Sequence, residues 1–216
     1  IREIHKYYFD RTTAADYEKL RIRRNLAIDK WILEELQVAL NAATNEWLLP
    51  AWSLDGIEKG ISNLYAYKQS YNDKMEPFYQ ILSGPTLKQV PYGIHRLRAG
   101  TNRPLIVAEG HFDYLALGSL LRRLGEDSRY DYIASPGAST FPKQYLSVFN
   151  GREVILLFDN DDAGRLGTDS LLRNMSHHSI MPQSVSVIEW PTTLPQRFDV
   201  SDAIVKLPKD LWKGSK

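Results

Sequence analysis

The most informative absence in this sequence is cysteine. None of the 216 residues is a cysteine, so the chain can neither form a disulfide nor hold zinc through thiolates. This composition fits a reducing compartment. A zinc module, if the protein has one, lies outside this stretch.

Long apolar runs are also lacking. No stretch of 18 apolar residues occurs, and residues 1–10 show no signal-peptide pattern. The sequence therefore predicts a cytoplasmic protein with no membrane association. It begins at Ile1 rather than at a methionine, and we expect it to be a piece of a longer protein.

Excess charge is the third absence. The formal net charge is +1, which gives no overall attraction to polyanions. The basic residues are nevertheless unevenly placed, in two groups: Arg21, Arg23 and Arg24 near the start of the chain, and Arg96, Arg98 and Arg103 just ahead of an acidic, strand-rich half. The first half is therefore the basic one.

The first half shows mixed local patterns. Apolar residues recur every three or four positions over 16–40, which predicts helices with a break near 25–29. Residues 46–68 hold short apolar runs around the turn signal Asp55-Gly56 and predict a hairpin or small antiparallel sheet. We expect 71–100 to be mostly irregular. This half is predicted to be a small α+β subdomain covering residues 1–102.

The second half changes character. Apolar runs typical of strands (104–108, 132–134, 154–158 and 185–188) alternate with helical patterns (112–124, 142–149 and 163–175). Such alternation predicts an α/β fold with a parallel sheet flanked by helices on both faces. We assign it to residues 103–216.

Carboxylates follow two of these predicted strands. Glu109-Gly110 follows the first, and Asp159 and Asp161 follow the third. Because the carboxyl ends of parallel strands meet at one edge of a sheet, these residues should converge. Asp113 lies one helical turn after Glu109 and can face the same site.

Clustered carboxylates repel one another unless a cation lies among them. Oxygen ligands of this kind suit Mg²⁺ or Mn²⁺, the ions that stabilise charge in phosphoryl transfer. Taken singly, Asp113 or Asp162 would more often be a helix cap. The two motifs together favour a metal site.

Two other classes of protein site place aspartates in a similar pattern, and both can be compared with this sequence. A calcium loop beginning at Asp159 would need a glutamate at its twelfth position, which is Ser170. A haloacid-dehalogenase-like phosphatase usually carries Asp-x-Asp on its first strand and Thr or Val at the fifth place, which here is Ala163. Neither pattern fits.

The two motifs resemble those of the TOPRIM (topoisomerase-primase) family. In that family one strand ends in Glu-Gly with an aspartate a turn later, and another strand ends in Asp-x-Asp. Residues 105–113 (LIVAEGHFD) and 156–164 (LLFDNDDAG) match this pattern, and the Ala-Gly ending is more typical of primases. Weaker matches upstream, at 23–28, 48–56 and 83–86, occur in the order found in bacterial-type primases.

The resemblance implies a Rossmann-like TOPRIM sheet preceded by the nucleic-acid-binding subdomain of a bacterial-type, phage or plasmid primase core. It implies that Glu109, Asp159 and Asp161 are catalytic. The resemblance also implies that these three residues, with Asp113, Asp199 and Asp202, are ligands of two or more Mg²⁺ or Mn²⁺ ions. Asp199 and Asp202 equally suit a helix cap.

The expected activity is metal-dependent synthesis of short primers from nucleoside triphosphates on a single-stranded DNA template, with a replicative helicase as partner. Phosphate contacts supply most sequence-independent affinity for nucleic acid. The candidate residues for these contacts are Lys68, Arg96, Arg98, Arg103 and Lys143. Two alternatives stay open: a TOPRIM nuclease that cleaves phosphodiesters, and a non-catalytic DNA-binding module of a helicase-primase.

Overall fold

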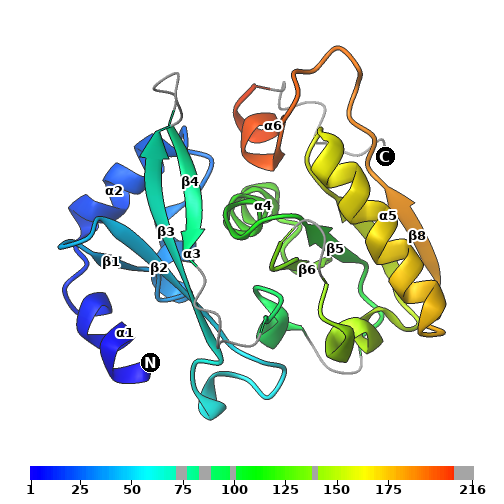
Figure 1. Ribbon diagram of the computed structural model, residues 1–216, viewed down its shortest axis with the longest axis horizontal. Coiled ribbons are helices and arrows are strands. Elements are labelled where there is room, and N and C mark those ends of the chain that lie inside the picture. The colour runs from blue at the N-terminus through cyan, green and yellow to red at the C-terminus, as the bar shows by residue number, and fades with distance from the viewer. Residues whose placement is uncertain (72–76, 83–88, 98–100, 138–140, 207–216) are drawn as a thin grey trace.

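The computed structural model of the protein describes residues 1–71, 77–82, 89–97, 101–137 and 141–206. It contains two four-stranded sheets, one antiparallel and one parallel. In Figure 1 the antiparallel sheet lies on the left, the parallel sheet on the right, and helix α4 between them. The predicted α/β fold with a smaller α+β part before it is confirmed.

The N-terminal part begins with three short helices, α1 (Arg2–Phe9), α2 (Ala14–Arg23) and α3 (Lys30–Glu35). Four antiparallel strands follow in sequential order: β1 (Ala39–Asn41), β2 (Glu46–Ala51), β3 (Asn63–Tyr71) and β4 (Pro77–Leu82). A short 3₁₀ helix, η1 (Ile57–Lys59), lies between β2 and β3. The predicted antiparallel pairing within 46–68 is therefore confirmed.

Two local expectations for this half were wrong, and one helix was not predicted. Strand β4 pairs with β3 inside the segment expected to be irregular, because its cross-strand partners, rather than its own composition, select the extended form. The helical pattern expected to reach position 40 ends at Glu35, since pairing with β2 holds Ala39–Asn41 as a strand. Helix α1 has no counterpart in the prediction. The predicted break at 25–29 does separate α2 from α3.

The C-terminal part follows the predicted alternation. A 3₁₀ helix, η2 (Ile94–Arg96), precedes it, and the elements are then β5 (Leu105–Ala108), α4 (His111–Leu124), β6 (Asp131–Ala134), η3 (Lys143–Phe149), β7 (Glu153–Leu157), α5 (Asp162–His177), β8 (Ser184–Val187) and α6 (Val200–Lys206). The helical pattern at 142–149 forms a 3₁₀ helix rather than an α-helix.

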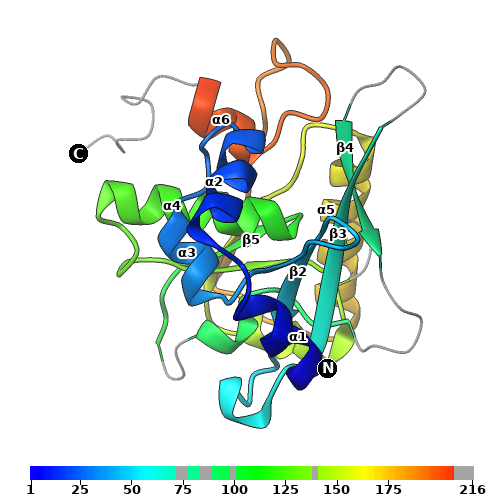
Figure 2. The ribbon, with the colours of Figure 1, turned by 90° about the vertical axis from the view of Figure 1, so that its left-hand side faces the viewer.

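The parallel sheet has the strand order β6-β5-β7-β8. The connection through α4 runs from β5 towards one edge, and the connection through α5 runs from β7 towards the other. Because both crossovers are right-handed, the two helices lie on opposite faces, as Figures 1 and 2 show. All four carboxyl ends therefore open at the same edge, where the acidic motifs lie.

A single apolar core joins the two sheets. It includes Trp47 and Leu49 of β2 as well as Val107 of β5 and Leu115 of α4. Tyr92, just before η2, exchanges two backbone hydrogen bonds of 2.9 Å with Ala134, the last residue of β6, and this pair ties the linking segment to the edge of the parallel sheet. The boundary between residues 102 and 103 stays a prediction.

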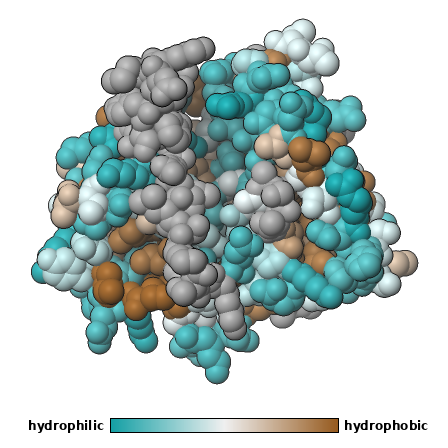
Figure 3. Space-filling view, in the orientation of Figure 1, coloured by the Kyte–Doolittle hydropathy of each residue, from teal (hydrophilic) through white to brown (hydrophobic). Residues whose placement is uncertain are grey.

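The surface is mainly polar. In the view of Figure 3 hydrophobic atoms lie in a few separate places, one of them over α1, where Ile4 is 60% exposed. Within the described ranges, no helix is both long and apolar enough to cross a membrane.

Candidate functional site

Glu109 lies directly beyond the carboxyl end of β5. The neighbouring strand β7 pairs with β5 in parallel, so the residue after Phe158 lies beside Glu109. The backbone N–H of Asp159 donates a hydrogen bond of 3.1 Å to Glu109 Oε2. Burial raises the pKa of Glu109, and the charge of Asp161 raises it further. The two predicted motifs therefore meet, as the sequence analysis expected.

Asp159 is the most strongly perturbed of the motif residues. Burial raises its pKa, and so do the charges of Asp113, Glu109, Asp199 and Asp161. All five carboxylates therefore lie within electrostatic range of one point at the carboxyl edge of the sheet. Each repels the others, so the ionised state of this cluster is unfavourable without a cation.

Asp161 has a structural contact as well. It is the N-cap of α5, where its Oδ1 accepts a hydrogen bond of 2.8 Å from the N–H of Gly164. Gly164 itself permits a close approach, since a β-carbon there would lie 2.2 Å from the carbonyl oxygen of Asp159. A glycine is thus required for the helix to begin so near the carboxylates.

Asp113 lies in the first turn of α4 and is only 7% exposed. Its Oδ2 accepts a hydrogen bond of 3.1 Å from the N–H of Gly110. Its Oδ1 is buried and has no hydrogen-bond partner among the described residues. Burial and the charge of Asp199 raise the pKa of Asp113. An unpaired buried carboxylate oxygen of this kind is costly unless a ligand satisfies it.

Asp199 reaches the cluster because the chain after β8 is attached to the loop that follows β7. The indole N–H of Trp190 donates to the carbonyl of Phe158 at 2.7 Å. Asn160 then exchanges backbone hydrogen bonds of 3.0 Å with Phe198 and Arg197. These contacts place Asp199 beside Asp159.

Asp199 and Asp202 also have the capping role that the sequence left open. Asp199 Oδ1 accepts a hydrogen bond of 2.7 Å from the N–H of Asp202 at the start of α6. Asp202 forms an ion pair of 2.6 Å with Lys206. Burial raises the pKa of Asp199, whereas this backbone hydrogen bond and the charge of Arg24 lower it. Asp199 can therefore cap α6 and also take part in the carboxylate cluster.

The donor set fits a hard divalent cation in its chemistry. The candidate ligands are all carboxylates, and neighbouring acids raise the pKa values of Glu109, Asp113, Asp159 and Asp199. One buried oxygen of Asp113 lacks a hydrogen-bond partner among the described residues. Over the part of the chain that the structure describes, however, no group of three such side chains is close enough to hold an ion in its present positions. Electrostatic repulsion acts over several ångströms, whereas Mg²⁺–oxygen bonds are about 2.1 Å long. The ligands would therefore have to move together on binding.

The candidate basic residues are scattered. Lys68 is exposed on β3, opposite Glu46 of β2. Arg103 is partly buried at the amino end of β5, the far end from Glu109. Arg98 lies outside the described residues. The structure therefore does not gather these three beside the carboxylates.

Two further basic candidates have local partners. Arg96 forms an ion pair of 2.8 Å with Glu35 of α3. Lys143 begins η3 and lies within electrostatic range of His178, the residue that ends α5. Because α5 is 16 residues long, Lys143 is about 24 Å from the end of the helix that Asp161 caps. Their contact with nucleic acid stays a prediction.

Unlike those residues, Arg24 lies near the carboxylate cluster. It was not among the site residues predicted from the sequence. It follows α2, and its guanidinium carbon lies 4.4 Å from the ring centre of Phe112. Its charge opposes the effect of burial on the pKa of Asp113 and Asp199. The three arginines at positions 21, 23 and 24 indicated a basic segment. Their spacing did not indicate which of them faces the second half.

A second contact between the halves lies just beneath the cluster. The hydroxyl of Tyr67 shares a hydrogen bond with Nδ1 of His111. Burial strongly lowers the pKa of His111, which keeps the ring neutral. Sequence patterns gave no indication of this pair, because it joins residues 44 positions apart.

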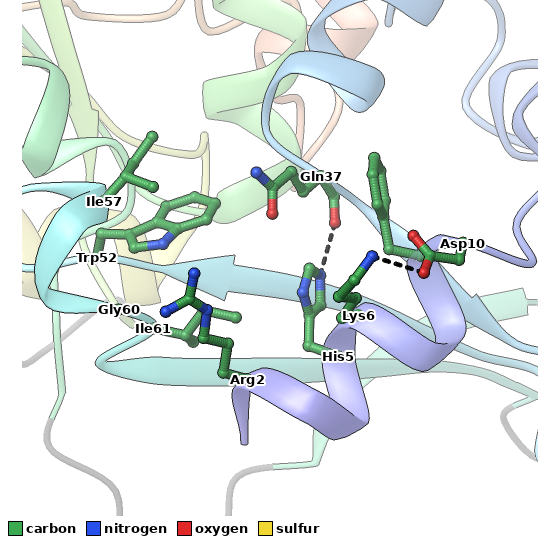
Figure 4. Close-up of a pocket in the computed structure, with 10 residues that line it drawn as sticks. Arg2, His5, Lys6, Asp10, Gln37, Trp52, Ile57, Gly60 and Ile61 are labelled. Atoms are coloured by element: carbon green, nitrogen blue, oxygen red, sulfur yellow. Dashed lines mark hydrogen bonds and ion pairs between the residues drawn. The ribbon is translucent and has the colours of Figure 1, made fainter.

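A separate cavity of about 260 Å³ lies beside α1. Figure 4 shows Arg2, His5 and Lys6 of this helix facing Trp52 and Ile57 across it. Lys6 is paired with Asp10, and His5 contacts the carbonyl of Gln37. None of the predicted site residues lines this cavity, so it is distinct from the carboxylate cluster.

The second half is similar to a known protein family. Residues 106–204 match the family model described as Toprim-like. This match covers both acidic motifs and Asp199. No curated protein matches the chain.

Two solved structures from bacteriophage T7 are similar in fold. One is the lagging-strand DNA polymerase interacting with primase domains of two gp4 subunits bound to an RNA/DNA hybrid and dTTP, with 17% identity, a TM-score of 0.54, and coverage of 86% of this chain and 87% of that chain. The other is the primase fragment of the primase-helicase protein, with 19% identity, a TM-score of 0.54, and coverage of 82% and 64%. At these identities the likeness is one of fold.

Proposed function

We propose that this chain, a TOPRIM-domain protein with the fold of a phage primase fragment, is the catalytic core of a DNA primase. The observation that carries the proposal is the convergence of Glu109, Asp159 and Asp161 with the buried Asp113 and the partly buried Asp199 at the carboxyl edge of a Toprim-like sheet. Residues 103–216 would form the catalytic domain, and residues 1–102 would bind nucleic acid.

The metal centre follows from the donor chemistry. Glu109, Asp159 and Asp161 would hold two or more Mg²⁺ or Mn²⁺ ions, with Asp113, Asp199 and Asp202 as further ligands. Bound divalent ions would neutralise the triphosphate and activate a 3′-hydroxyl for attack on an α-phosphate. The Oδ1 of Asp113, which has no hydrogen-bond partner in the part of the chain that the structure describes, supports this assignment.

The protein's own groups would contribute in three ways. Burial raises the pKa of Glu109, and its carboxylate would accept the proton of the attacking hydroxyl. The amino end of α5, adjacent to Asp161 and Gly164, directs its positive end towards a phosphate. The backbone hydrogen bond from Asp159 keeps the Glu109 side chain in place.

The expected partners are a single-stranded DNA template, nucleoside triphosphates and a replicative helicase. The similar T7 primase structures include one with an RNA/DNA hybrid and dTTP and one from a primase-helicase, which supports these classes here. Lys68, Arg96, Arg98, Arg103 and Lys143 remain the proposed contacts to phosphate.

The decisive experiment is primer synthesis on a mixed single-stranded template with labelled ribonucleotides and deoxyribonucleotides, in Mg²⁺ and in Mn²⁺. We expect short products from the wild type and a loss of at least about 10³-fold in Asp159→Asn, because one carboxylate of a metal site is removed. Asp162→Asn is the matched control, since Asp162 is adjacent but exposed and paired with Arg165; it should retain synthesis.

Other outcomes would change the assignment. Normal synthesis by Asp159→Asn would exclude the proposed metal site. Degradation of labelled DNA in Mn²⁺ without nucleotides would indicate a nuclease. Binding of DNA without chemistry under either metal would indicate a binding module.

A further inference from the structure

The segment between β8 and α6, which rises in orange in Figure 1, is attached to the Asp-x-Asp motif through the middle residue of that motif, Asn160. The side-chain amide of Asn160 donates hydrogen bonds of 3.4 and 3.1 Å to the carbonyls of Leu194 and Pro195. Its backbone N–H donates to the carbonyl of Phe198, and its carbonyl accepts from the N–H of Arg197, each at 3.0 Å. These four hydrogen bonds hold the segment beside the two aspartates.

Arg197 has an unusual backbone conformation within this segment. Its φ is +62°, in the left-handed region that residues with a β-carbon rarely adopt. Such conformations cost free energy and persist only where the surrounding contacts enforce them. Here the backbone hydrogen bond to Asn160 is such a contact. A residue that is strained in this way at the edge of a site is a candidate for a functional contact.

The side chain of Arg197 starts from a well-anchored backbone and ends in solvent. The next residue, Phe198, is 1% exposed and packs edge-to-face against Trp190, with ring centres 5.2 Å apart. The indole N–H of Trp190 donates to the carbonyl of Phe158, just beyond β7. Arg197 itself is exposed, and among the described residues its guanidinium has no ion pair, hydrogen bond or ring contact.

Other cations act on the acids nearest to Arg197 in the chain and at the motif. The charge of Arg24 lowers the pKa of Asp199, the acid two positions after Arg197. Asp162, which directly follows the Asp-x-Asp motif, is paired with Arg165 at 2.6 Å. The positive charge of Arg197 is therefore available to an anion that approaches the motif from solvent.

A triphosphate is the anion that best matches this position. A guanidinium group binds phosphate oxygens through two parallel hydrogen bonds, and the amino end of α5, directly after Asp161, also favours phosphate. Residues 188–199 contain a single cation, Arg197, and two acids. A surface that follows a nucleic-acid backbone needs several cations, so one compact phosphate group is the better match.

We propose that Arg197 binds the triphosphate of a nucleotide beside the carboxylate cluster, and that Asn160 positions Arg197 for this contact. Arg197 is then a substrate-binding residue, and Asn160 is a positioning residue that acts through it. This inference rests on the proposed primase function, because it takes a nucleoside triphosphate as the ligand. Its test measures binding and does not require primer synthesis.

The affinity of the full chain for ATP is measured by calorimetry in saturating Mn²⁺. We expect Arg197→Gln to bind ATP about tenfold more weakly than the wild type, because a charge-assisted hydrogen bond to phosphate is lost. Arg197→Lys should have an intermediate affinity, since lysine keeps the charge without the paired donors. Arg173→Gln is the matched control. Arg173 is exposed on α5 about 17 Å from the amino end of the helix, and this variant should bind ATP like the wild type.

A single-stranded DNA oligonucleotide is the second probe. Arg197→Gln should leave its affinity unchanged. A loss of oligonucleotide affinity as large as the loss for ATP, or larger, would assign Arg197 to nucleic acid and overturn the proposal. Equal ATP affinities of Arg197→Gln and the wild type would overturn it while leaving the primase assignment intact. Failure of the wild type to bind ATP in Mn²⁺ would count against both.

The positioning role of Asn160 is tested by Asn160→Ala, which removes both side-chain hydrogen bonds and retains the backbone pair. We expect faster hydrogen exchange at the Arg197 amide and about threefold weaker ATP binding. In an Arg197→Gln background the same change should weaken ATP binding no further, because both residues act through one contact. Unchanged exchange, or additive losses of affinity, would show that Asn160 does not position Arg197.

Discussion

At the amino end of the parallel sheet, Asp131 is buried beside Arg152, whose Nη1 lies 2.6 Å from the carboxylate. At the carboxyl end, Asp113 is buried and Asp159 is partly buried, and most of the charges that act on them belong to other carboxylates. The first arrangement compensates its charge internally, as a structural ion pair does. In the second, Arg24 offsets only part of the negative charge, which is typical of sites that bind a cation.

The largest effect should come from removing the buried ion pair between Arg152 and Asp131 at the amino end of the sheet. Arg152→Met leaves Asp131 buried without its partner and should lower the free energy of unfolding by about 3–5 kcal/mol. Denaturant titration would measure the change. Arg165→Met, which removes an exposed ion pair, should cost less than about 1 kcal/mol. Equal costs would mean that the buried pair has no special role.

The next largest effect concerns the glycine at the carboxyl end. Gly164→Ala places a β-carbon against the backbone of Asp159 and should cost about 1–3 kcal/mol through forced shifts. It should also reduce primer synthesis, because the loop that moves carries two of the proposed ligands. Ala163→Ser, at an exposed neighbouring position, is the control. A fully active and stable Gly164→Ala variant would refute the tight packing.

A smaller effect is expected in the pH dependence of stability without metal. Asp113 and Asp159 have pKa values raised to about 8 and about 9 by burial and by neighbouring acids. Folding therefore favours their protonated forms, and the stability they contribute is lost as the pH rises from about 4 through these values. The lowered pKa values of His5, His95 and His111 act oppositely, but only below about pH 6.5.

Between pH 7 and pH 9 the stability should depend on these carboxylates and not on the histidines. In a chelator, the free energy of unfolding should fall by about 1–2 kcal/mol across this range. Asp159→Asn should flatten the dependence and raise stability at pH 9, and Mn²⁺ should flatten it in the wild type. If the free energy of unfolding of the wild type in chelator stays constant from pH 7 to 9, the carboxylates at the carboxyl end do not repel one another appreciably.

The smallest effect tests Arg24, a cation near the cluster. Arg24→Gln should cost about 1 kcal/mol in the wild type at pH 9, because Arg24 offsets part of the charge of Asp113 and Asp199. In an Asp113→Asn background the same change should cost about half as much. Denaturant unfolding of the four proteins gives the coupling directly. Additive effects would mean that Arg24 acts only through its contact with Phe112.

Local patterns predicted the second half well. The apolar alternation over 104–188 sufficed for the parallel sheet, since each βαβ unit is encoded within about 30 consecutive residues and its handedness is constrained. The strand-end carboxylates Glu109 and Asp159 could be paired for the same reason. Prediction was poorer at β4 and β1, where long-range pairing rather than local composition decides the structure.

The sequence by itself therefore determined the α/β class, the parallel sheet, and the edge at which Glu109, Asp159 and Asp161 meet. Only the tertiary structure decided which charges share that edge. It brought Asp199 to Asp159 through backbone contacts at Asn160, directed Arg24 rather than its neighbours towards Phe112, and placed Arg103 and Lys143 at the other end of the sheet. Electrostatic partners are set by distance in space, and sequence patterns report distance only within one element or one crossover.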